Sequence, residues 1–377
     1  MIDHHPAHAG ALLTIDLNAI CDNWRLLKAR IRTADCAAVV KANAYGLGAS
    51  RVAQALFDVG CLHFFVAHLD EAIELRSCLH PSTRVYVLHG PPSGTESEFV
   101  AHNLIPVLNS LEQLDDWHKL ASHLGNRLRG LVQVDTGMSR LGLSFADLDV
   151  LATDSSRLRG IDVLYSMSHL ASAEDQTNPF NNEQLNRFVA ARKRLPDCPA
   201  SFANSSGVFL GSPYHFDLVR PGAALYGIAP VAGAANPMRS VIRLQAKVMQ
   251  VRFVEAGTPV GYGGTWRTKR RSRIATISVG YADGFLRSIS NRGLAYVDGA
   301  AVPLIGNVSM DTITIDVSDV PESRVHADAL VDLISPENGV DRMAVAAGTI
   351  GYEVLTSLGS RYSRRYVGGE QTSASTS

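Results

Sequence analysis

The sequence predicts an α/β fold, a (β/α)8 barrel of the TIM type followed by a mostly β domain. From Leu12 to about Gly227, short apolar strands alternate with helix-length amphipathic segments. Such regular alternation is typical of a parallel sheet closed into a barrel. After Pro237 the chain changes to short strands separated by Gly, Pro and Asp turns, with little helix. The 377 residues leave room for both domains.

Nine segments of the first part have the apolar, β-branched character of buried strands. They are Leu12–Leu17, Ala38–Val40, Phe64–Ala67, Val85–Leu88, Ile105–Leu108, Leu131–Val134, Val163–Tyr165, Ser201–Ala203 and Val219–Leu225. This is one strand more than a barrel takes, so we expect the first to pack elsewhere. The helices predicted between the strands include Ala49–Asp58, Leu111–Leu124 and Asn182–Arg194.

The stretch Pro230–Pro237, rich in Ala, Gly and Pro, separates the two parts. The strand-like segments beyond it are Leu244–Val254, Arg273–Val279, Leu294–Val297, Val302–Val308, Thr312–Val317 and Ala329–Leu333. We therefore predict a barrel over residues 12–233 and a mostly β domain over 234–368, with which residues 1–17 could pack. The polar tail, 369–377, is predicted to be disordered.

The bulk composition excludes several classes of partner. The 35 basic and 36 acidic side chains give a formal net charge of −1, which indicates no nucleic-acid partner. The five cysteines form no C-x-x-C pair, so we predict reduced thiols and no metal site. No apolar run approaches the roughly 20 residues that span a bilayer, and the N-terminus lacks the pattern of a signal peptide. We expect a cytoplasmic protein with no membrane partner.

The segment Val39–Tyr45 carries the first chemical signal. An apolar strand ends at Lys41, Tyr45 follows four residues later, and Gly46 opens a turn. Burial lowers the pKa of an ammonium and makes the amine available as a nucleophile or for a Schiff base. A lysine that reaches from the strand end to solvent explains this segment alone equally well.

Polar residues follow the other predicted barrel strands too. In a barrel these strand ends meet on one face, where catalytic residues gather. The candidates are Lys41 with Tyr45, His68, His89, Asn109, Asp135 with Arg140, His169, Asn204 with Ser205, and Arg220 with Gly222. A single histidine there is more often structural than catalytic, but the whole set on one rim indicates a site.

Two small-residue turns, Ala203–Gly207 and Arg220–Ala223, offer free backbone N–H groups late in the barrel. Barrels commonly bind phosphate through such turns at their last strands. A phosphate beside a buried lysine points to pyridoxal 5′-phosphate, whose aldehyde needs that amine. Alone, the first turn would be interpreted as a helix cap.

Taken together, these motifs resemble the bacterial alanine racemases over nearly the whole chain. The resembling segments, in order, are Ala38–Gly46, Val134–Gly142, Ala203–Ser206, Val219–Gly222, Val260–Trp266, Gly280–Gly284 and Ser309–Asp311. The resemblance implies a pyridoxal-phosphate-dependent isomerase that interconverts L-alanine and D-alanine, for biosynthesis or degradation of D-alanine. It also implies a homodimer with shared active sites.

The resemblance implies a role for each matching residue. The catalytic bases would be Lys41, which also holds the cofactor as an aldimine, and Tyr262. The cofactor-binding set would be Lys41, Tyr45, His169, Asn204, Ser205, Arg220, Gly222, Ala223 and Tyr352. The substrate-binding set would be Arg140, Met310, Tyr281 and Asp311. In the family, the residues matching Tyr262, Tyr281, Met310 and Asp311 act on the partner subunit's cofactor.

A two-base mechanism makes physical sense of these roles. Racemisation removes the Cα proton from one face and returns a proton to the other, so Lys41 and Tyr262 would serve opposite faces. A phenol with an unperturbed pKa of about 10 is a poor base at neutral pH. A hydrogen-bonded chain through His169 to Arg220 would favour its phenolate. A guanidinium can donate to the pyridine nitrogen but hardly protonates it.

One position departs from the family pattern. Many members carry a carbamylated lysine two residues before the aspartate of the Asp-Thr-Gly-Met segment, and this chain has Gln133 there. A neutral amide can accept from Arg140 but cannot neutralise it. We therefore expect no carbamate, and either a direct Gln133–Arg140 hydrogen bond or a bound anion such as chloride.

Other functions remain open at this point. Tyr281 and Tyr352 should crowd the active-site mouth and favour alanine, but serine differs by one hydroxyl and a small pocket rejects it only modestly. A barrel-type amino-acid decarboxylase should carry a cysteine in the second domain, whereas the last cysteine here is Cys198. A non-catalytic pyridoxal-phosphate carrier would have no use for Tyr262, and a structural barrel would bind no cofactor.

Overall fold

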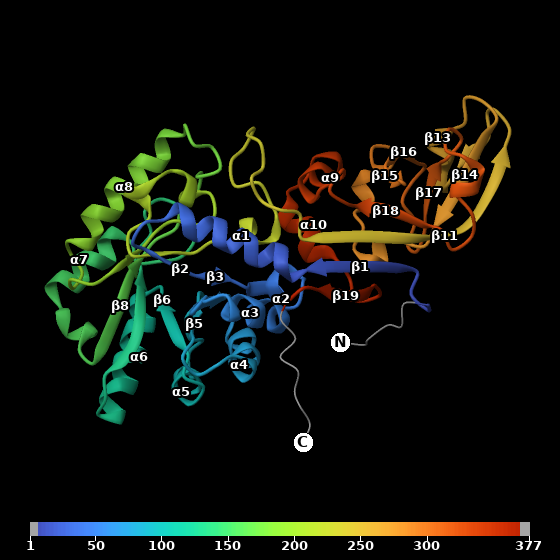
Figure 1. Ribbon diagram of the computed structural model, residues 1–377. Coiled ribbons are helices and arrows are strands. Elements are labelled where there is room, and N and C mark those ends of the chain that lie inside the picture. Colours follow the sequence, from blue (N-terminus) through green and yellow to red (C-terminus); the bar gives the residue numbers. More distant parts are fainter. Residues whose placement is uncertain (1–6, 370–377) are drawn as a thin grey trace, which may run out of the picture. The chain divides into compact units, whose positions relative to one another are not determined.

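The computed structural model describes residues 7–369 and forms two units (Figure 1). One unit covers Ile20–Met238, and the other joins the segment up to Ala19 to the segment from Arg239 onward. The tail over residues 369–377 is predicted to be disordered, but its residues beyond 369 lie outside the described range. Within that range, no helix is both long enough and apolar enough to cross a membrane.

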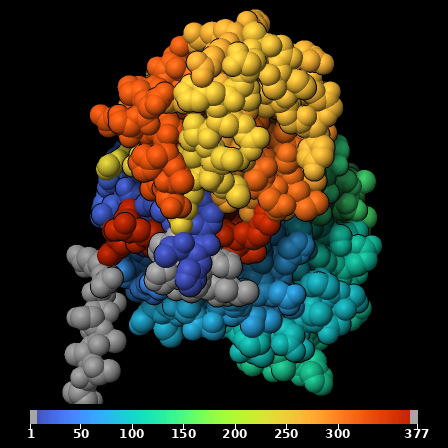
Figure 2. Space-filling model, turned by 90° about the vertical axis from the view of Figure 1, so that its right-hand side faces the viewer, coloured from blue at the N-terminus to red at the C-terminus, as the bar shows by residue number. Residues whose placement is uncertain are grey.

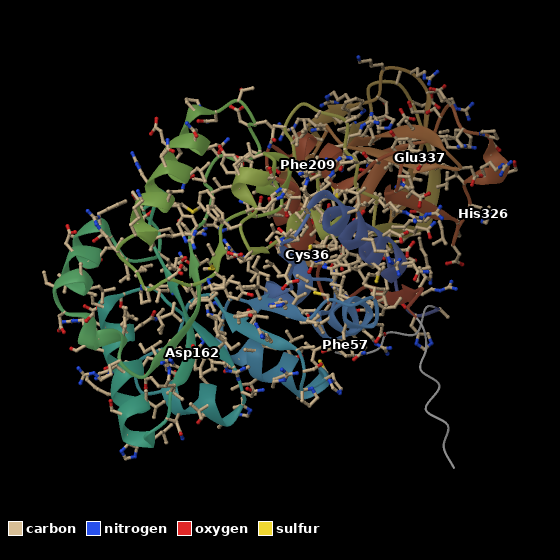
Figure 3. The ribbon with its side chains drawn as sticks, turned by 60° about the vertical axis from the view of Figure 1, so that its left-hand side comes forward. Cys36, Phe57, Asp162, Phe209, His326 and Glu337 are labelled. Carbon is tan, nitrogen blue, oxygen red and sulfur yellow. The ribbon has the colours of Figure 1, made fainter. Side chains whose placement is uncertain are left out.

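The first unit is built on parallel strands. They are β2 Asp35–Cys36, β3 Ala38–Val39, β4 His63–Val66, β5 Arg84–Val87, β6 Ile105–Leu108, β7 Leu128–Gln133, β8 Ile161–Met167, β9 Ala200–Ser201 and β10 Leu218–Val219. Strands β3 to β9 pair in sequence order, and β10 pairs with β2. Figure 3 labels Cys36 on β2 and Asp162 on β8.

Backbone hydrogen bonds close this ring of strands. Ala37 N donates to Val219 O at 2.9 Å, and Arg220 N donates to Ala203 O at 2.9 Å. These two hydrogen bonds join the end of β10 to the residue between β2 and β3 on one side and to the residues just after β9 on the other. The predicted (β/α)8 barrel is therefore confirmed. Every residue of β4 and β6 is buried, because helices cover the outer face and side chains fill the interior.

Helices follow most of the barrel strands. The helices are α1 Leu17–Arg30, α2 Lys41–Tyr45, α3 Ala49–Asp58, α4 Leu69–Cys78, α5 Glu96–Ala101, α6 Leu111–Leu124, α7 Phe145–Thr153 and α8 Pro179–Arg192, with short 3-10 turns η1 Ser155–Leu158, η2 Gly207–Phe209, η3 Ser212–Tyr214 and η4 Ala223–Tyr226. Helices α3 and α6 have the predicted limits. Helix α8 begins earlier than predicted because Asn178 Oδ1 caps Phe180 N at 3.0 Å and Pro179 suits the first helical position.

One strand prediction was wrong. The strand expected over Val219–Leu225 ends at Val219, and Ala223–Tyr226 forms the 3-10 turn η4. Pro221 has no N–H for the ladder, so the strand stops and the chain turns just beyond Arg220. The apolar residues of η4 are buried, although they do not form a strand.

The second unit is built on a mostly antiparallel sheet. Figure 2 shows the surface of its residues from about 240 to 330 in yellow to orange. Its strands are β1 Ala11–Asp16, β11 Ile242–Val254, β12 Pro259–Val260, β13 Trp266–Arg267, β14 Ser272–Ile277, β15 Leu294–Val297, β16 Ala300–Ile305, β17 Ile313–Asp316, β18 Leu330–Ile334 and β19 Ser363–Val367. Its helices and 3-10 turns are α9 Val340–Ala347, α10 Gly351–Ser357, η5 Tyr262–Gly264, η6 Tyr281–Asp283, η7 Arg287–Ile289 and η8 Glu322–Arg324.

Strand β11 organises this sheet. The order is β14-β17-β16-β15-β18-β11-β1-β19, and a further pairing of β14 with β11 closes six of the strands into a ring. At 13 residues, β11 is long enough to pair with β1 and β18 in its first half and with β14 in its second. Strand β1 lies between β11 and β19, outside the parallel barrel.

Candidate active site

Lys41 stands where β3 ends and α2 begins. Each of the four residues after it, Ala42 to Tyr45, has a positive φ of 52–55°, so α2 is a left-handed turn. This conformation costs a non-glycine residue roughly 1–2 kcal/mol. Such a run persists only where its surroundings hold it, and strained backbone of this kind clusters at functional sites.

The environment of Lys41 makes its ammonium easier to deprotonate. Burial lowers the pKa of Lys41 below its ordinary value, the positive charge of Arg140 lowers it further, and the carboxylate of Glu71 opposes both. An amine with a lowered pKa is a better nucleophile and a better proton acceptor near neutral pH. The sequence leaves open whether Lys41 reaches to solvent or acts as a Schiff-base amine, and a lowered pKa is the property that the second interpretation requires.

Arg220, just beyond β10, is 3% exposed and contacts no carboxylate of residues 7–369. Its Nη1 donates to Ser201 Oγ, and its Nη2 donates to Ser168 O at 2.6 Å. Burial lowers the pKa of Arg220 to about 9. Its Nε has no acceptor among the described residues, so one donor of a firmly held cation is left for a ligand.

His169 follows β8 and contacts Arg220. Its Nδ1 lies 3.4 Å from Arg220 Nη2. Burial, and then the charges of Arg220, Arg140 and Lys41, hold the pKa of His169 well below its usual range. Because a guanidinium only donates, Nδ1 must accept, and the neutral ring then carries its proton on Nε2. The predicted pairing of these two residues is present.

The two small-residue turns form a cradle of backbone groups. Ser205 Oγ accepts from Gly222 N at 2.9 Å and from Ala224 N at 3.2 Å, which ties the turns together. A Cβ on Gly222 would lie 2.5 Å from Tyr45 Oη, so only glycine lets the tyrosine approach. Within residues 7–369, the Ala223 N–H has no acceptor.

The side chain of Asn204 helps to hold the turn that carries Ser205. Its Nδ2 donates to Leu170 O at 3.3 Å, and its Oδ1 accepts from Gly207 N at 2.9 Å. Both ends of the amide are therefore engaged by the protein. Asn204 shapes the turn that presents Ser205.

Arg140 is exposed on the loop after β7. Asp135 Oδ1 accepts from Gly137 N at 2.8 Å and from Ser139 N at 3.1 Å, which fixes the turn before the arginine. The predicted Gln133–Arg140 hydrogen bond is not formed. Gln133 Nε2 donates instead to Leu141 O at 3.0 Å, because the chain folds back beside β7 and brings that carbonyl within reach.

The other rim candidates differ in kind. Asn109 is buried, and its amide donates to Val107 O at 2.8 Å and Leu88 O at 3.0 Å, so it is structural. His68 and His89 are exposed, and their rings meet edge-on with centroids 4.5 Å apart. Both stay on the rim without a bond to the residues described above.

Sequence reasoning missed several residues that hold the site together. Fully buried Gln184 of α8 donates to His169 O at 3.0 Å and to Thr136 Oγ1 at 3.2 Å, joining the loops after β7 and β8. Ser201, inside β9, accepts from Arg220. A small polar residue within a predicted strand was the only signal for Ser201.

In the second unit, the loop between β16 and β17 gathers most of the predicted residues. Tyr281 N donates to Ser309 O at 3.0 Å, and Ala282 N donates to Met310 O at 3.0 Å, which brings η6 against Met310. Asn307 Nδ2 donates to Tyr262 O at 2.8 Å. The Tyr262 side chain is 74% exposed, and Met310 and Tyr281 are exposed too.

Arg361 completes this cluster. Its Nε donates to Asp283 Oδ1 at 2.6 Å, and its Nη1 donates to Asp311 Oδ1 at 2.8 Å. Asp283 also accepts from Gly280 N at 2.9 Å. Asp311 is thus held beside η6. The remaining predicted residue, Tyr352, is exposed on α10.

Fold and site together define a protein with a parallel barrel, a lysine of lowered pKa at the barrel's strand ends, and an antiparallel β domain. Comparisons with known proteins identify it further. The model of the alanine racemase N-terminal domain matches residues 15–230, and that of the alanine racemase C-terminal domain matches residues 241–366. The chain belongs to the alanine racemase family.

Individual relatives agree with this placement. The alanine racemase of Rhodospirillum rubrum is 49% identical over 97% of this chain and 98% of its own. The catabolic alanine racemase of Mesorhizobium japonicum is 51% identical over 96% of this chain and 95% of its own. The crystal structure of alanine racemase from Bartonella henselae, with covalently bound pyridoxal phosphate, has a TM-score of 0.92 at 42% identity and covers 95% of this chain and 100% of its own.

Proposed function

We propose that this chain interconverts L-alanine and D-alanine with pyridoxal 5′-phosphate, through Lys41 and a Tyr262 supplied by a second copy. The observation that carries the proposal is the group around Lys41, in which an amine of lowered pKa accompanies a neutral His169 bound to a buried Arg220. Relatives named alanine racemase share about half of its residues.

The described residues fit the cofactor. The Ala223 N–H, without an acceptor among the described residues, suits a phosphate oxygen, and Gly222 lets the Tyr45 hydroxyl lie close to this turn. The unpaired Nε of Arg220 suits the pyridine nitrogen, and Lys41 supplies the amine for the aldehyde. When bound, pyridoxal phosphate withdraws electrons from the amino acid and acidifies its Cα proton.

Lys41 and Tyr262 would divide the proton transfer. The Lys41 amine would take or return the Cα proton on one face, where its lowered pKa suits a base. The Tyr262 oxygen would do so on the other face. The proton that His169 carries on Nε2 makes this ring a donor, which can stabilise a phenolate at Tyr262 while Arg220 fixes the tautomer.

Substrate would be held by its carboxylate. Arg140, whose loop Asp135 fixes, offers a bidentate cation, and the exposed Met310 segment offers backbone groups. Tyr281 and Tyr352 would narrow the approach and favour a small side chain.

A homodimer would complete each site. Tyr262, Tyr281 and Met310 are large side chains exposed on one loop cluster, as expected for residues that meet a partner. In this arrangement the second domain of one copy serves the barrel of the other. A cytoplasmic location accords with the buried cysteines Cys21, Cys36 and Cys61, which form no disulfide among the described residues.

Racemisation rates test the proposal directly. L-alanine, L-serine and L-leucine are assayed side by side with wild type and Lys41→Ala. Alanine should react fastest, serine within roughly 10²-fold of it, and leucine slowest, and Lys41→Ala should lose at least roughly 10³-fold on alanine. A cofactor-loaded wild type that racemises none of the three would refute the proposal.

A further inference from the structure

The carboxylate of Glu71, in the first turn of α4, accepts hydrogen bonds from three backbone N–H groups. Oε1 accepts from Ala42 N at 2.6 Å, and Oε2 accepts from Ala67 N at 2.8 Å and His68 N at 3.1 Å. The last two contacts cap α4 and bind the end of β4. The first reaches 29 positions back along the chain, to the left-handed turn after Lys41.

The Ala42 N–H belongs to the peptide unit that joins Lys41 to Ala42. Anchoring this N–H therefore fixes the backbone rotation ψ of Lys41. On the other side of the lysine, Val40 N donates to Phe65 O at 2.8 Å. The lysine is thus held on both sides by the end of β4, once through the strand ladder and once through Glu71.

The turn needs such an anchor because it is strained. Four consecutive non-glycine residues, Ala42 to Tyr45, are left-handed. Bonds inside the turn, such as Ala44 N to Val40 O at 2.8 Å, hold its helical form but not its direction relative to β4. A carboxylate supplies two acceptor oxygens and strong charge-assisted bonds. An amide in its place has one acceptor, and its NH2 would face an N–H.

We propose that Glu71 is a positioning residue for the racemase reaction. By holding the Lys41–Ala42 peptide, Glu71 keeps the Lys41 amine in the orientation that the reaction needs. This inference rests on the proposed function of Lys41. Glu71 also brings a negative charge close to that amine, opposite Arg140. The other titratable groups facing Lys41 are His89 and His169, from the ends of β5 and β8.

The matched pair Glu71→Gln and Glu74→Gln tests the proposal. Both remove one carboxylate from α4, but Glu74 is exposed and its carboxylate makes no contact among the described residues. Three quantities are compared in each full-length protein: kcat and KM for L-alanine, the circular dichroism of bound pyridoxal phosphate, and the rate at which the apoprotein takes up the cofactor covalently.

Glu71→Gln should lower kcat by roughly tenfold to a hundredfold, as a displaced reacting group does, with little change in KM. It should also slow covalent uptake and change the circular dichroism, whereas Glu74→Gln should match wild type in all three.

Two results would overturn the inference. One is a Glu71→Gln protein that matches Glu74→Gln in kcat and covalent uptake. The other is a Glu71→Gln protein that loses only thermal stability and keeps the wild-type dichroism and kcat. If wild type itself neither racemises alanine nor takes up the cofactor, the proposed function fails instead, so the two failures are distinguishable.

Discussion

At the scale of single residues, the site places a buried cation, Arg220, in contact with a neutral histidine, His169. Arg220 is buried and bound only by neutral oxygens and His169. Burial, together with the charge of Arg220, holds the pKa of His169 well below its usual range, and a neutral His169 is the link that a phenolate needs. The chemistry proposed for Tyr262 thus depends on a cation that never has to transfer a proton.

Tyr262→Phe tests the division of labour between the two bases. Racemisation should fall by roughly 10²- to 10⁴-fold in both directions, because one proton acceptor is missing. Exchange of the Cα proton with deuterated water should survive for one enantiomer, the one whose proton faces Lys41. Proton NMR of each enantiomer in deuterated water measures this. Equal loss of exchange from both enantiomers would contradict two separate bases.

His63 lies outside the proposed active site and is expected to make the stability of the folded protein depend on pH. Burial lowers the pKa of His63 to about 4, although Asp35 opposes the shift, and its Nδ1 bonds Tyr86 Oη at 3.0 Å. The folded state therefore resists protonation that the unfolded chain accepts below about pH 6.5. Stability on the order of 3 kcal/mol should be present above that pH and be lost as the pH falls toward 4.

Urea unfolding of wild type and His63→Asn checks this expectation. The asparagine keeps a polar atom near Tyr86 but cannot titrate. Its free energy of unfolding should fall less than that of wild type between pH 7 and pH 4.5. Parallel losses in the two proteins would show that His63 does not carry the effect.

At the scale of elements, the site is made of turns where strands end. Three turns form it: the left-handed α2, the turn at Ser205 and the turn into η4. Each presents backbone N–H or C=O groups that a helix or strand would use in its own hydrogen bonds. The periodic patterns predicted α3 and α6 well, because long amphipathic or apolar segments leave one choice of structure. Turns have no such periodicity.

This explains which predictions failed. Nothing in Ala42 or Ala44 signals a positive φ, which these residues adopt only under tertiary constraint. The η4 segment is as apolar as a strand, so burial alone could not distinguish the two. Of the two alternatives expected for Gln133, the direct hydrogen bond to Arg140 is not formed, because the fold of the chain brings Leu141 O to the amide, and a bound anion stays a prediction. Lys41 and Arg220 were found because a charge at the end of an apolar strand demands an explanation.

Gly222→Ala tests the cradle. The added Cβ would lie 2.5 Å from Tyr45 Oη and 3.2 Å from Val39 Cβ, so the tyrosine must move away from the cradle. The affinity for pyridoxal phosphate, measured by fluorescence titration of the apoprotein, should fall by at least about tenfold, the effect of losing one good hydrogen bond. Gly339→Ala is the control, because a Cβ there meets nothing within 4 Å. Unchanged affinity in Gly222→Ala would argue against phosphate at this turn.

At the scale of the whole molecule, the residues proposed for the reaction lie on two units of different architecture. The barrel carries Lys41, Arg140, His169 and Arg220, while the β unit presents Tyr262 on a surface loop. The family resemblance predicts that these come together between copies. Each copy would then be inactive without the other, and each dimer would have two equivalent sites.

Mixing two inactive variants tests this central claim most directly. Lys41→Ala and Tyr262→Phe are purified separately, dissociated, mixed in equal amounts and reassembled. A hybrid dimer has one site with both Lys41 and Tyr262 and one site with neither, so random reassortment should restore about a quarter of wild-type racemase activity. If the mixture stays as inactive as its parents although hybrid dimers form, Lys41 and Tyr262 of different copies do not share a site.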